Sequence, residues 1–248
     1  YSSLHPLISS TLLQLACLSD TDTKQQLLQW SLNETLSVSK FRFTGAFDAS
    51  ADYDRFLKDF VRNENCMSAL GCTGTPATPV SLTCTELSTS VQSMTFFDRL
   101  NDNDITHGGH IRGCFDETFH GLTIGDKLRE MLINEDSENA FVYSETEKKE
   151  LIYVLFRLLA IGGGMCQPDV NIERYLELTK GLYRDLLTVY KAPVTGEVTV
   201  SGRVFLVEAV KGVSLHPEED KPFNTLVMVI EPLRKEVRVL KCDYKSFW

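Results

Sequence analysis

Apolar residues recur at helical spacing in several segments, which are separated by residues that start or stop helices. Near the N-terminus, Lys24–Leu36 and Asp52–Val61 each carry one apolar face. In the middle of the chain, helix-capping residues precede further segments that the spacing predicts as helices: Ile124–Ile133 behind Thr123, Lys148–Ile161 behind the capping box of Ser144 and Glu147, and the segment from Asn171 to Val189. The segment that ends at Ile161 is apolar on most sides, which predicts burial, and the glycines at 162–164 end it.

Strand patterns dominate the C-terminal part. Valine-rich stretches at Val198–Val207, Leu226–Ile230 and Val237–Leu240 are separated by turn residues, which predicts three or four strands in an antiparallel meander. Shorter stretches at Lys40–Thr44 and Val80–Cys84 indicate two more strands. The predicted fold class is therefore α+β, with a helical middle segment packed against an antiparallel C-terminal β-meander.

Changes in these patterns divide the chain into four parts. Residues 1–61 form a helix-strand-helix part, residues 62–83 a loop or insertion rich in Thr, Gly and Pro, residues 84–192 a mainly helical region, and residues 193–248 the β region. A loop as long as 62–83 is uncommon inside a compact domain, which indicates an insertion or a seam between two lobes. We expect the four parts to form one compact domain.

Composition narrows the classes of function. The chain has 248 residues, 34 acidic and 25 basic side chains and a net charge of −9, which argues against nucleic acid as a partner because phosphate binding needs a positive surface. The longest apolar stretch, residues 151–164, contains Arg157 and is shorter than the about 20 residues that span a bilayer, so we predict no membrane segment. Seven scattered cysteines without a Cys-x-x-Cys pair indicate free thiols in a reducing compartment.

Negative charge is concentrated in the middle of the chain, where residues 93–150 hold 13 acidic and 6 basic side chains. Such a segment can steer and orient a basic partner, although a merely solvated acidic face explains it equally well. Aromatic rings and charges are the usual anchors of protein interfaces. The predicted partner-binding residues are therefore Phe96, Phe97, Asp98, Arg99, Asp102, Asp104, Glu135, Asp136 and Glu138. For the two phenylalanines, burial in the core is an interpretation of at least equal weight.

One group of residues has the types that bind metals. His107, His110, Cys114 and His120 are closely spaced, and imidazole with thiolate suits zinc. The spacing is loose, so polar loop histidines and a buried free cysteine are the favoured interpretation. The sequence also contains no nucleophile elbow and no catalytic cysteine signature. We therefore predict a non-enzyme without a cofactor, with a zinc-binding domain or a metal-dependent enzyme built on these four residues as the alternative.

The middle of the chain also carries a series of short motifs. They are Met94–Leu100, Asp102, Asp104–Ile105, Gly109–Ile111, Cys114, Asp126–Arg129, Glu135–Glu138, Leu151–Tyr153, Gly162–Gly163, Cys166–Gln167, Tyr175–Lys180 and Tyr183–Leu186. In order and spacing, this series resembles the central signature of the cilia- and flagella-associated protein 300 family. Residues 29–31, 41 and 43 and the segment 232–240 are similar to the family's N-terminal part and last strands, whereas residues 62–83 match nothing in it.

The resemblance implies a non-enzymatic protein of the cytoplasm and of the cilium or flagellum, including its axoneme. It also implies a role in the assembly of outer and inner dynein arms. The implied partners are dynein-arm preassembly factors of the Kintoun type and intraflagellar transport or dynein proteins, with neither nucleic acid nor membrane among them. The family has no catalytic or ligand residues to carry over. We expect an adaptor that binds these proteins through an exposed surface, with a permanent axonemal component as the alternative.

Overall fold

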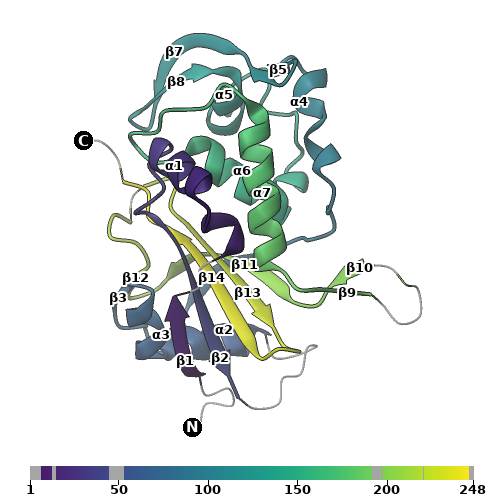
Figure 1. Ribbon diagram of the computed structural model, residues 1–248. Coiled ribbons are helices and arrows are strands. Elements are labelled where there is room, and N and C mark those ends of the chain that lie inside the picture. Colours follow the sequence, from purple (N-terminus) through teal and green to yellow (C-terminus); the bar gives the residue numbers. More distant parts are fainter. Residues whose placement is uncertain are drawn as a thin grey trace.

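An antiparallel sheet brings together strands from both ends of the chain (Figure 1). The computed structural model describes residues 7–12, 15–44, 53–191, 196, 198–219 and 221–245. The strand order is β1-β2-β14-β13-β11-β12-β3, and β4 pairs with β11. These strands are β1 (Leu7–Leu12), β2 (Leu36–Phe43), β3 (Thr73–Gly74), β4 (Leu82–Leu87), β11 (Arg203–Val210), β12 (Val213–Ser214), β13 (Thr225–Glu231) and β14 (Glu236–Cys242).

Helices cover both faces of this sheet. They are α1 (Thr21–Gln29), α2 (Tyr53–Arg62), α3 (Glu64–Ala69), α4 (Arg99–Asp102), α5 (Lys127–Ile133), α6 (Leu151–Ile161) and α7 (Ile172–Leu186), with the 3₁₀ turns η1 (Ala16–Leu18), η2 (Met94–Phe97) and η3 (Glu147–Lys149). Helices α2 and α3 pack on one face, and α6 and α7 pack on the other. The described part of the chain contains no helix with the length and apolar character needed to cross a membrane.

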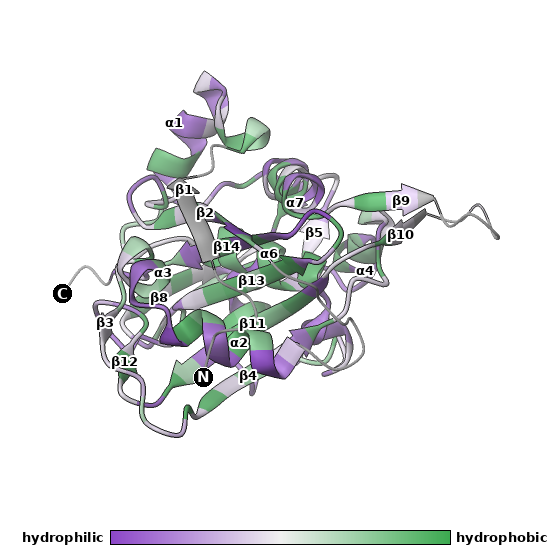
Figure 2. Ribbon diagram, turned by 90° about the horizontal axis from the view of Figure 1, so that it is seen from below, coloured by the Kyte–Doolittle hydropathy of each residue, from purple (hydrophilic) through white to green (hydrophobic). Residues whose placement is uncertain are grey.

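The central strands of the sheet are buried on both faces. Successive residues of β13, such as Met228 and Val229, belong to different hydrophobic clusters, one beneath α2 and the other beneath α6. In Figure 2, β11 and β13 are coloured as largely hydrophobic strands. This three-layer arrangement explains why β13 reads as a continuous apolar run rather than as an alternating pattern.

A glycine and a stacked pair of rings join α1, α6 and α7. Gly162 ends α6 with φ of 68°, a left-handed conformation that favours glycine. A Cβ at this position would lie 2.8 Å from the carbonyl oxygen of Trp30, so a larger residue would push α6 away from the end of α1. Trp30 itself is fully buried and stacks on Tyr175 of α7 with a ring separation of 4.4 Å. The predicted helix stop is therefore also a packing contact.

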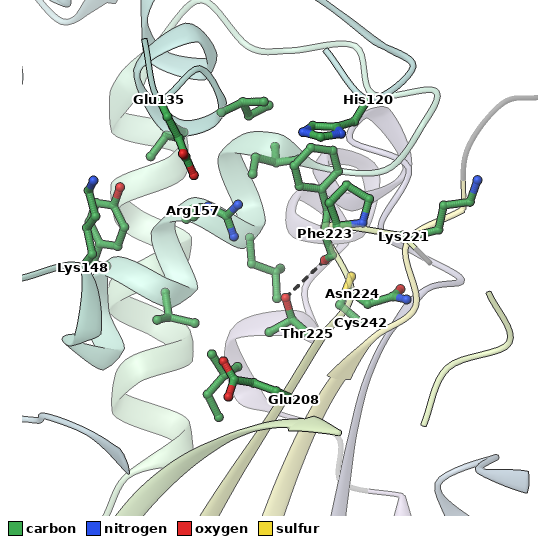
Figure 3. Close-up of a pocket in the computed structure, with 18 of the residues that line it drawn as sticks. His120, Glu135, Lys148, Arg157, Glu208, Lys221, Phe223, Asn224, Thr225 and Cys242 are labelled. Atoms are coloured by element: carbon green, nitrogen blue, oxygen red, sulfur yellow. Dashed lines mark hydrogen bonds between the residues drawn. The ribbon is translucent and has the colours of Figure 1, made fainter. Parts of the chain in front are cut away.

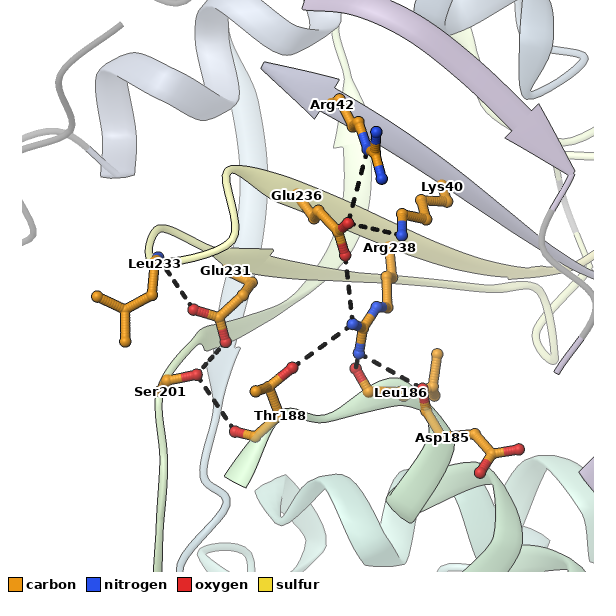
Figure 4. A network of polar contacts seen from close by, with 10 residues as sticks. All are labelled: Lys40, Arg42, Asp185, Leu186, Thr188, Ser201, Glu231, Leu233, Glu236 and Arg238. Carbon is orange, nitrogen blue, oxygen red and sulfur yellow. Dashed lines mark hydrogen bonds and ion pairs between the residues drawn. The ribbon is translucent and has the colours of Figure 1, made fainter. Parts of the chain in front are cut away.

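A polar network ties the sheet to the C-terminal end of α7 (Figure 4). Arg238 of β14 donates to the carbonyl oxygen of Leu186 at 2.9 Å and lies 3.4 Å from Glu236. Glu236 in turn pairs with Lys40 of β2 at 2.6 Å. Burial alone would raise the pKa of Glu236, but the hydrogen bond and charge of Lys40 and the charge of Arg238 outweigh it and hold this pKa below its ordinary value. The guanidinium of Arg238 therefore offsets the negative end of α7.

The predicted α+β class and C-terminal meander are confirmed, with β11, β13 and β14 as consecutive neighbours. Several helix boundaries were wrong. Helix α6 begins at Leu151 and not at Lys148, and α7 ends at Leu186 and not at Val189, which already belongs to a strand. Helix α1 ends at Gln29 and not at Leu36, because Leu36 already pairs with Cys242 in the sheet. Helix α5 begins at Lys127 because Asp126, and not Thr123, accepts the capping hydrogen bond from the backbone N–H of Arg129 at 2.8 Å.

The structure also contains elements that the periodicity did not predict. Helix α3 lies within residues 62–83, where we expected a loop. The mainly helical region contains two hairpins, β5 (Thr106–His107) with β6 (His110–Ile111) and β7 (Gly113–Phe119) with β8 (Leu122–Asp126). A separate ribbon pairs β9 (Val189–Lys191) with β10 (Val198–Val200), so β10 does not join the main sheet. These elements are short, and a helix of six residues leaves little periodic signal.

Candidate functional site

The two phenylalanines among the predicted partner-binding residues are core residues. Phe96 is 8% exposed and Phe97 is 3% exposed. The ring of Phe97 lies 4.4 Å from that of Phe156 on α6, and the ring of Phe96 lies 4.9 Å from that of Tyr143. The core interpretation therefore describes these two rings, and a role as exposed anchors does not fit their burial.

Arg99 fastens the η2–α4 segment to the loop that precedes α6. Its guanidinium lies 5.0 Å from the centre of the Tyr143 ring, pairs with Glu147 at 2.8 Å and donates to the carbonyl oxygen of Val142 at 3.1 Å. A ring contact, an ion pair and a hydrogen bond within the chain give Arg99 a role in holding these two segments together.

The aspartates of the same segment differ from one another. Asp98 and Asp102 are exposed and, among the described residues, pair with no cation. Asp104 has a left-handed backbone with φ of 58° and forms ion pairs with Arg112 and, at 3.6 Å, with Lys127. The hydrogen bond from Arg112 holds the pKa of Asp104 below its ordinary value. Of these three carboxylates, only Asp104 is committed to internal contacts.

The acidic loop, which we define as residues 134–141, follows α5 and presents unpaired charge. Its carboxylates are all exposed and, within the described part of the chain, form no ion pair: Glu135, Asp136 and Glu138. Phe141 ends the loop with 83% of its surface exposed. The fold therefore brings the predicted acidic residues together with an aromatic ring that the sequence analysis did not single out.

In the described part of the chain, the four residues of the alternative zinc hypothesis do not come together as a metal site. His107 and His110 are exposed in the β5–β6 hairpin. Cys114 lies on β7, where burial and nearby carboxylates raise the pKa of its thiol, which disfavours the thiolate that a metal requires. His120 lies in the turn between β7 and β8, with its ring 6.1 Å from that of Phe223. Within the described residues, no group of three or more His, Cys, Asp or Glu side chains could hold a metal ion.

A pocket of 890 Å³ lies between α6, the end of α5, β11 and the loop before β13 (Figure 3). Arg157 projects into it from α6, and the acidic loop borders it through Glu135 and Phe141. The guanidinium of Arg157 lies 5.9 Å from the centre of the Phe223 ring. In the sequence, Arg157 is the single charged residue of the apolar stretch 151–164, and this contrast indicates a site of interest. The sequence did not show that Arg157 lines a pocket.

Comparison with known proteins identifies the family. The family model described as cilia- and flagella-associated protein 300 matches residues 8–242, which is nearly the whole chain. The chain belongs to the cilia- and flagella-associated protein 300 family. This result confirms the resemblance found in the sequence motifs and gives the chain a role associated with cilia and flagella.

Two curated relatives carry the same family name. A "Cilia- and flagella-associated protein 300" of Chlamydomonas reinhardtii is 30% identical over 249 residues, which cover 94% of this chain and 95% of the relative. A protein of that name from Paramecium tetraurelia is 27% identical over 238 residues, which cover 93% of this chain and 91% of the relative. No solved structure matches the chain. The similarity to the family therefore extends over nearly the full length of the chain.

Proposed function

We propose that this chain is a non-enzymatic adaptor for the cytoplasmic assembly or the intraflagellar transport of outer and inner axonemal dynein arms. Its membership in a cilia- and flagella-associated family supports the ciliary setting of the proposal. On this proposal, its partners are dynein-arm preassembly factors of the Kintoun type, intraflagellar transport proteins or dynein subunits. It works in the cytoplasm before it reaches the cilium, and neither nucleic acid nor a membrane is a partner.

The proposal rests on the exposed carboxylates of the acidic loop, which form no ion pair among the described residues. Some other carboxylates within residues 93–150 are used inside the molecule: Asp126 pairs with Arg129 at 2.6 Å, and Glu150 accepts a hydrogen bond from the hydroxyl of Ser88 at 2.6 Å. The carboxylates of the acidic loop have no such cation among the described residues and lie close in sequence to exposed Phe141. Unpaired charge and an exposed ring are features that protein interfaces use for orientation and for affinity.

Charge reversal of the acidic loop tests this proposal. The variant carries Glu135→Lys, Asp136→Lys and Glu138→Lys in the full-length protein, expressed in ciliated cells and recovered by affinity capture. We expect the recovery of Kintoun-type factors and transport proteins to fall about tenfold, the effect of losing about 1.4 kcal/mol of interaction. The dependence of capture on salt concentration should also become shallower, because fewer exposed charges then contribute.

A matched variant controls for the change in net charge. It reverses three exposed carboxylates that form no ion pair among the described residues and lie in other elements: Glu34, Glu64 and Glu177. This control should keep its partners. Equal loss in both variants would show a general charge effect, and full capture by a folded acidic-loop variant would refute the proposed surface. High-salt extraction of cilia then separates a transport adaptor, which is released, from a stable axonemal component, which is retained.

A further inference from the structure

Arg157 is the one charged residue of α6, whose other residues are almost all apolar. Its side chain enters the pocket described above, together with Val154, Leu158 and Ile161 from the same face of the helix. Among the described residues, the guanidinium contacts the ring of Phe223 but receives no hydrogen-bond acceptor and no ion pair. The pocket therefore contains a cation whose donors are unused.

This arrangement leaves the guanidinium partly desolvated in the free protein, because Arg157 is half-buried. Burial of the guanidinium lowers the pKa of Arg157 below its ordinary value. The contact with Phe223 returns part of the lost hydration energy, but a ring face accepts none of the five N–H donors in a directional hydrogen bond. Arg157 is half-buried and opens onto the pocket, so its free donors can be reached by a ligand that supplies acceptors.

We propose that this pocket binds a peptide segment of a partner protein through one carboxylate group, which Arg157 holds in a bidentate ion pair. The planar fork of a guanidinium matches the two oxygens of a carboxylate. The apolar side chains of the peptide lie against Leu158 and Phe223 in the same pocket. Its volume of 890 Å³ is within the range of about 300–1,000 Å³ that is usual for ligand pockets.

The charges around the rim favour a single carboxylate over a phosphate. Two lysines line the rim, but Lys148 pairs with Glu145 at 2.8 Å and Lys221 pairs with Glu218 at 3.3 Å, so these cations add little to the site. Three carboxylates that form no ion pair among the described residues also line the pocket: Glu135, Glu208 and Glu219. One central cation surrounded by negative groups tolerates a monoanion, whereas it repels a phosphate dianion, a nucleotide or an anionic lipid surface.

This inference goes beyond the proposed adaptor function, because it concerns an acidic ligand inside the pocket and not a basic partner on the outer surface. It requires neither dynein nor a transport protein. Its test uses the purified chain with synthetic peptides, so its failure is distinguishable from failure of the capture experiment above.

A titration followed by NMR tests the site through the Nε–H signal of Arg157 in the purified full chain. The probes share the sequence acetyl-Gly-Gly-Leu-Phe and differ at one group. One has a free C-terminal carboxylate and one a C-terminal amide, while two further amides carry Glu or phosphoserine in place of the second Gly. We expect the free acid, the Glu peptide or both to bind with a Kd of about 1 mM or tighter. Whichever of these two binds more tightly identifies the source of the carboxylate.

Two variants and the comparison among the peptides decide the proposal. Binding to Arg157→Met is followed through the backbone amide signals of the pocket residues Leu158 and Phe223. This variant should bind the carboxylate about tenfold or more weakly, because a charge-assisted pair is lost, whereas Glu135→Gln should bind it more tightly because a repulsive charge is removed. Equal binding of the neutral amide, tighter binding of the phosphopeptide, unchanged binding to Arg157→Met, or no binding by any peptide would each overturn it.

A stability measurement separates a binding role for Arg157 from a structural one. If the guanidinium is held unpaired for a ligand, Arg157→Met removes a costly group while keeping an apolar stem in the pocket. The Tm of the free protein should then rise by about 2–4 °C. A lower Tm for this variant, together with unchanged peptide binding, would show that Arg157 supports the fold and not a ligand.

Discussion

Replacing Arg238 should cost the fold much more than replacing Arg42, although both arginines face the same carboxylate of Glu236. Arg238 has a side chain that is 9% exposed, and it donates to the carbonyl oxygen of Leu186 at 2.9 Å. Hydrogen bonds to charged groups contribute about 1.5–3 kcal/mol, and a cation at a helix C-terminus adds about 0.3–2 kcal/mol. Glu236 keeps its pair with Lys40 at 2.6 Å, so it does not become an isolated buried charge. We therefore expect Arg238→Met to lower the free energy of unfolding by about 2–4 kcal/mol.

Arg42 provides the matched control on the same carboxylate. Its side chain is 65% exposed and lies 3.7 Å from Glu236, the geometry of a surface ion pair. Such pairs contribute about 0.2–1 kcal/mol, so Arg42→Met should change the free energy of unfolding by no more than this amount.

Urea unfolding followed by circular dichroism measures both variants. If unfolding is not reversible, the Tm serves instead, and Arg238→Met should lower it by about 4–16 °C. A double-mutant cycle with Glu236→Gln then apportions the effect, because a penalty that persists in the Glu236→Gln background belongs to the contacts with α7 and not to the ion pair. The reasoning is refuted if Arg238→Met destabilises the protein no more than Arg42→Met does.

Three further predictions follow from the burial and charge of named groups. The fold lowers the pKa of Glu236, so the ionised carboxylate stabilises the protein fully above its ordinary pKa of 4.5, and this stabilisation is lost as the pH falls through the lowered value. In Glu236→Gln, the free energy of unfolding should therefore fall less steeply with pH in that window. An unchanged pH profile would contradict this. Phe97→Ala should lower the free energy of unfolding by about 3–5 kcal/mol because the ring is buried in the core. Phe141→Ala should change it by no more than about 0.5 kcal/mol because this ring is exposed. Equal effects of the two variants in urea unfolding would rule out the described packing. Because His110 and Cys114 lie outside any donor cluster in the described residues, elemental analysis should find less than one zinc per chain and EDTA should leave the Tm unchanged; stoichiometric zinc would show that the donors assemble differently.

A local capping signal predicted the start of α7 correctly. Asn171 accepts a hydrogen bond from the backbone N–H of Glu173 at 3.0 Å and starts α7, as its sequence position indicates. The capping box of Ser144 and Glu147 also forms, with a hydrogen bond of 2.8 Å from the backbone N–H of Ser144 to the Glu147 carboxylate. Even so, α6 begins only at Leu151.

Contacts with a distant part of the chain explain why α6 begins later than the capping box predicts. Glu150 has an extended backbone, with ψ of 135°, and its carboxylate accepts hydrogen bonds from the hydroxyls of Ser88 and Ser90. These contacts cross about 60 residues of sequence, so no local pattern contains them. A buried carboxylate with three hydrogen-bond donors in reach gains more from these bonds than from continuing the helix.

The candidate sites also combine features that the local sequence showed with features that only the packing of distant segments explains. The sequence located the acidic loop, because charge is counted along the chain, and it raised burial of Phe96 as an alternative, because aromatic rings favour the core. It did not show that Phe141 is an exposed residue of that loop, and it did not show that Arg157 lines a pocket. Exposure and enclosure depend on which distant segments pack nearby, and a single sequence does not contain that information.

Taken alone, the sequence determined the α+β class, the amphipathic faces of α2 and α7, and the family. The class and the faces follow from caps and periodicity, which are local signals, and the family follows from the order of motifs along residues 94–186. Only the tertiary structure decided that β2 lies beside β14, with Leu36 opposite Cys242 and Arg42 opposite Glu236. Strand partners are chosen by backbone hydrogen bonds and by the burial of both sheet faces across the whole chain. The same long-range packing left Arg157 facing a cavity and gave the acidic loop its exposed ring.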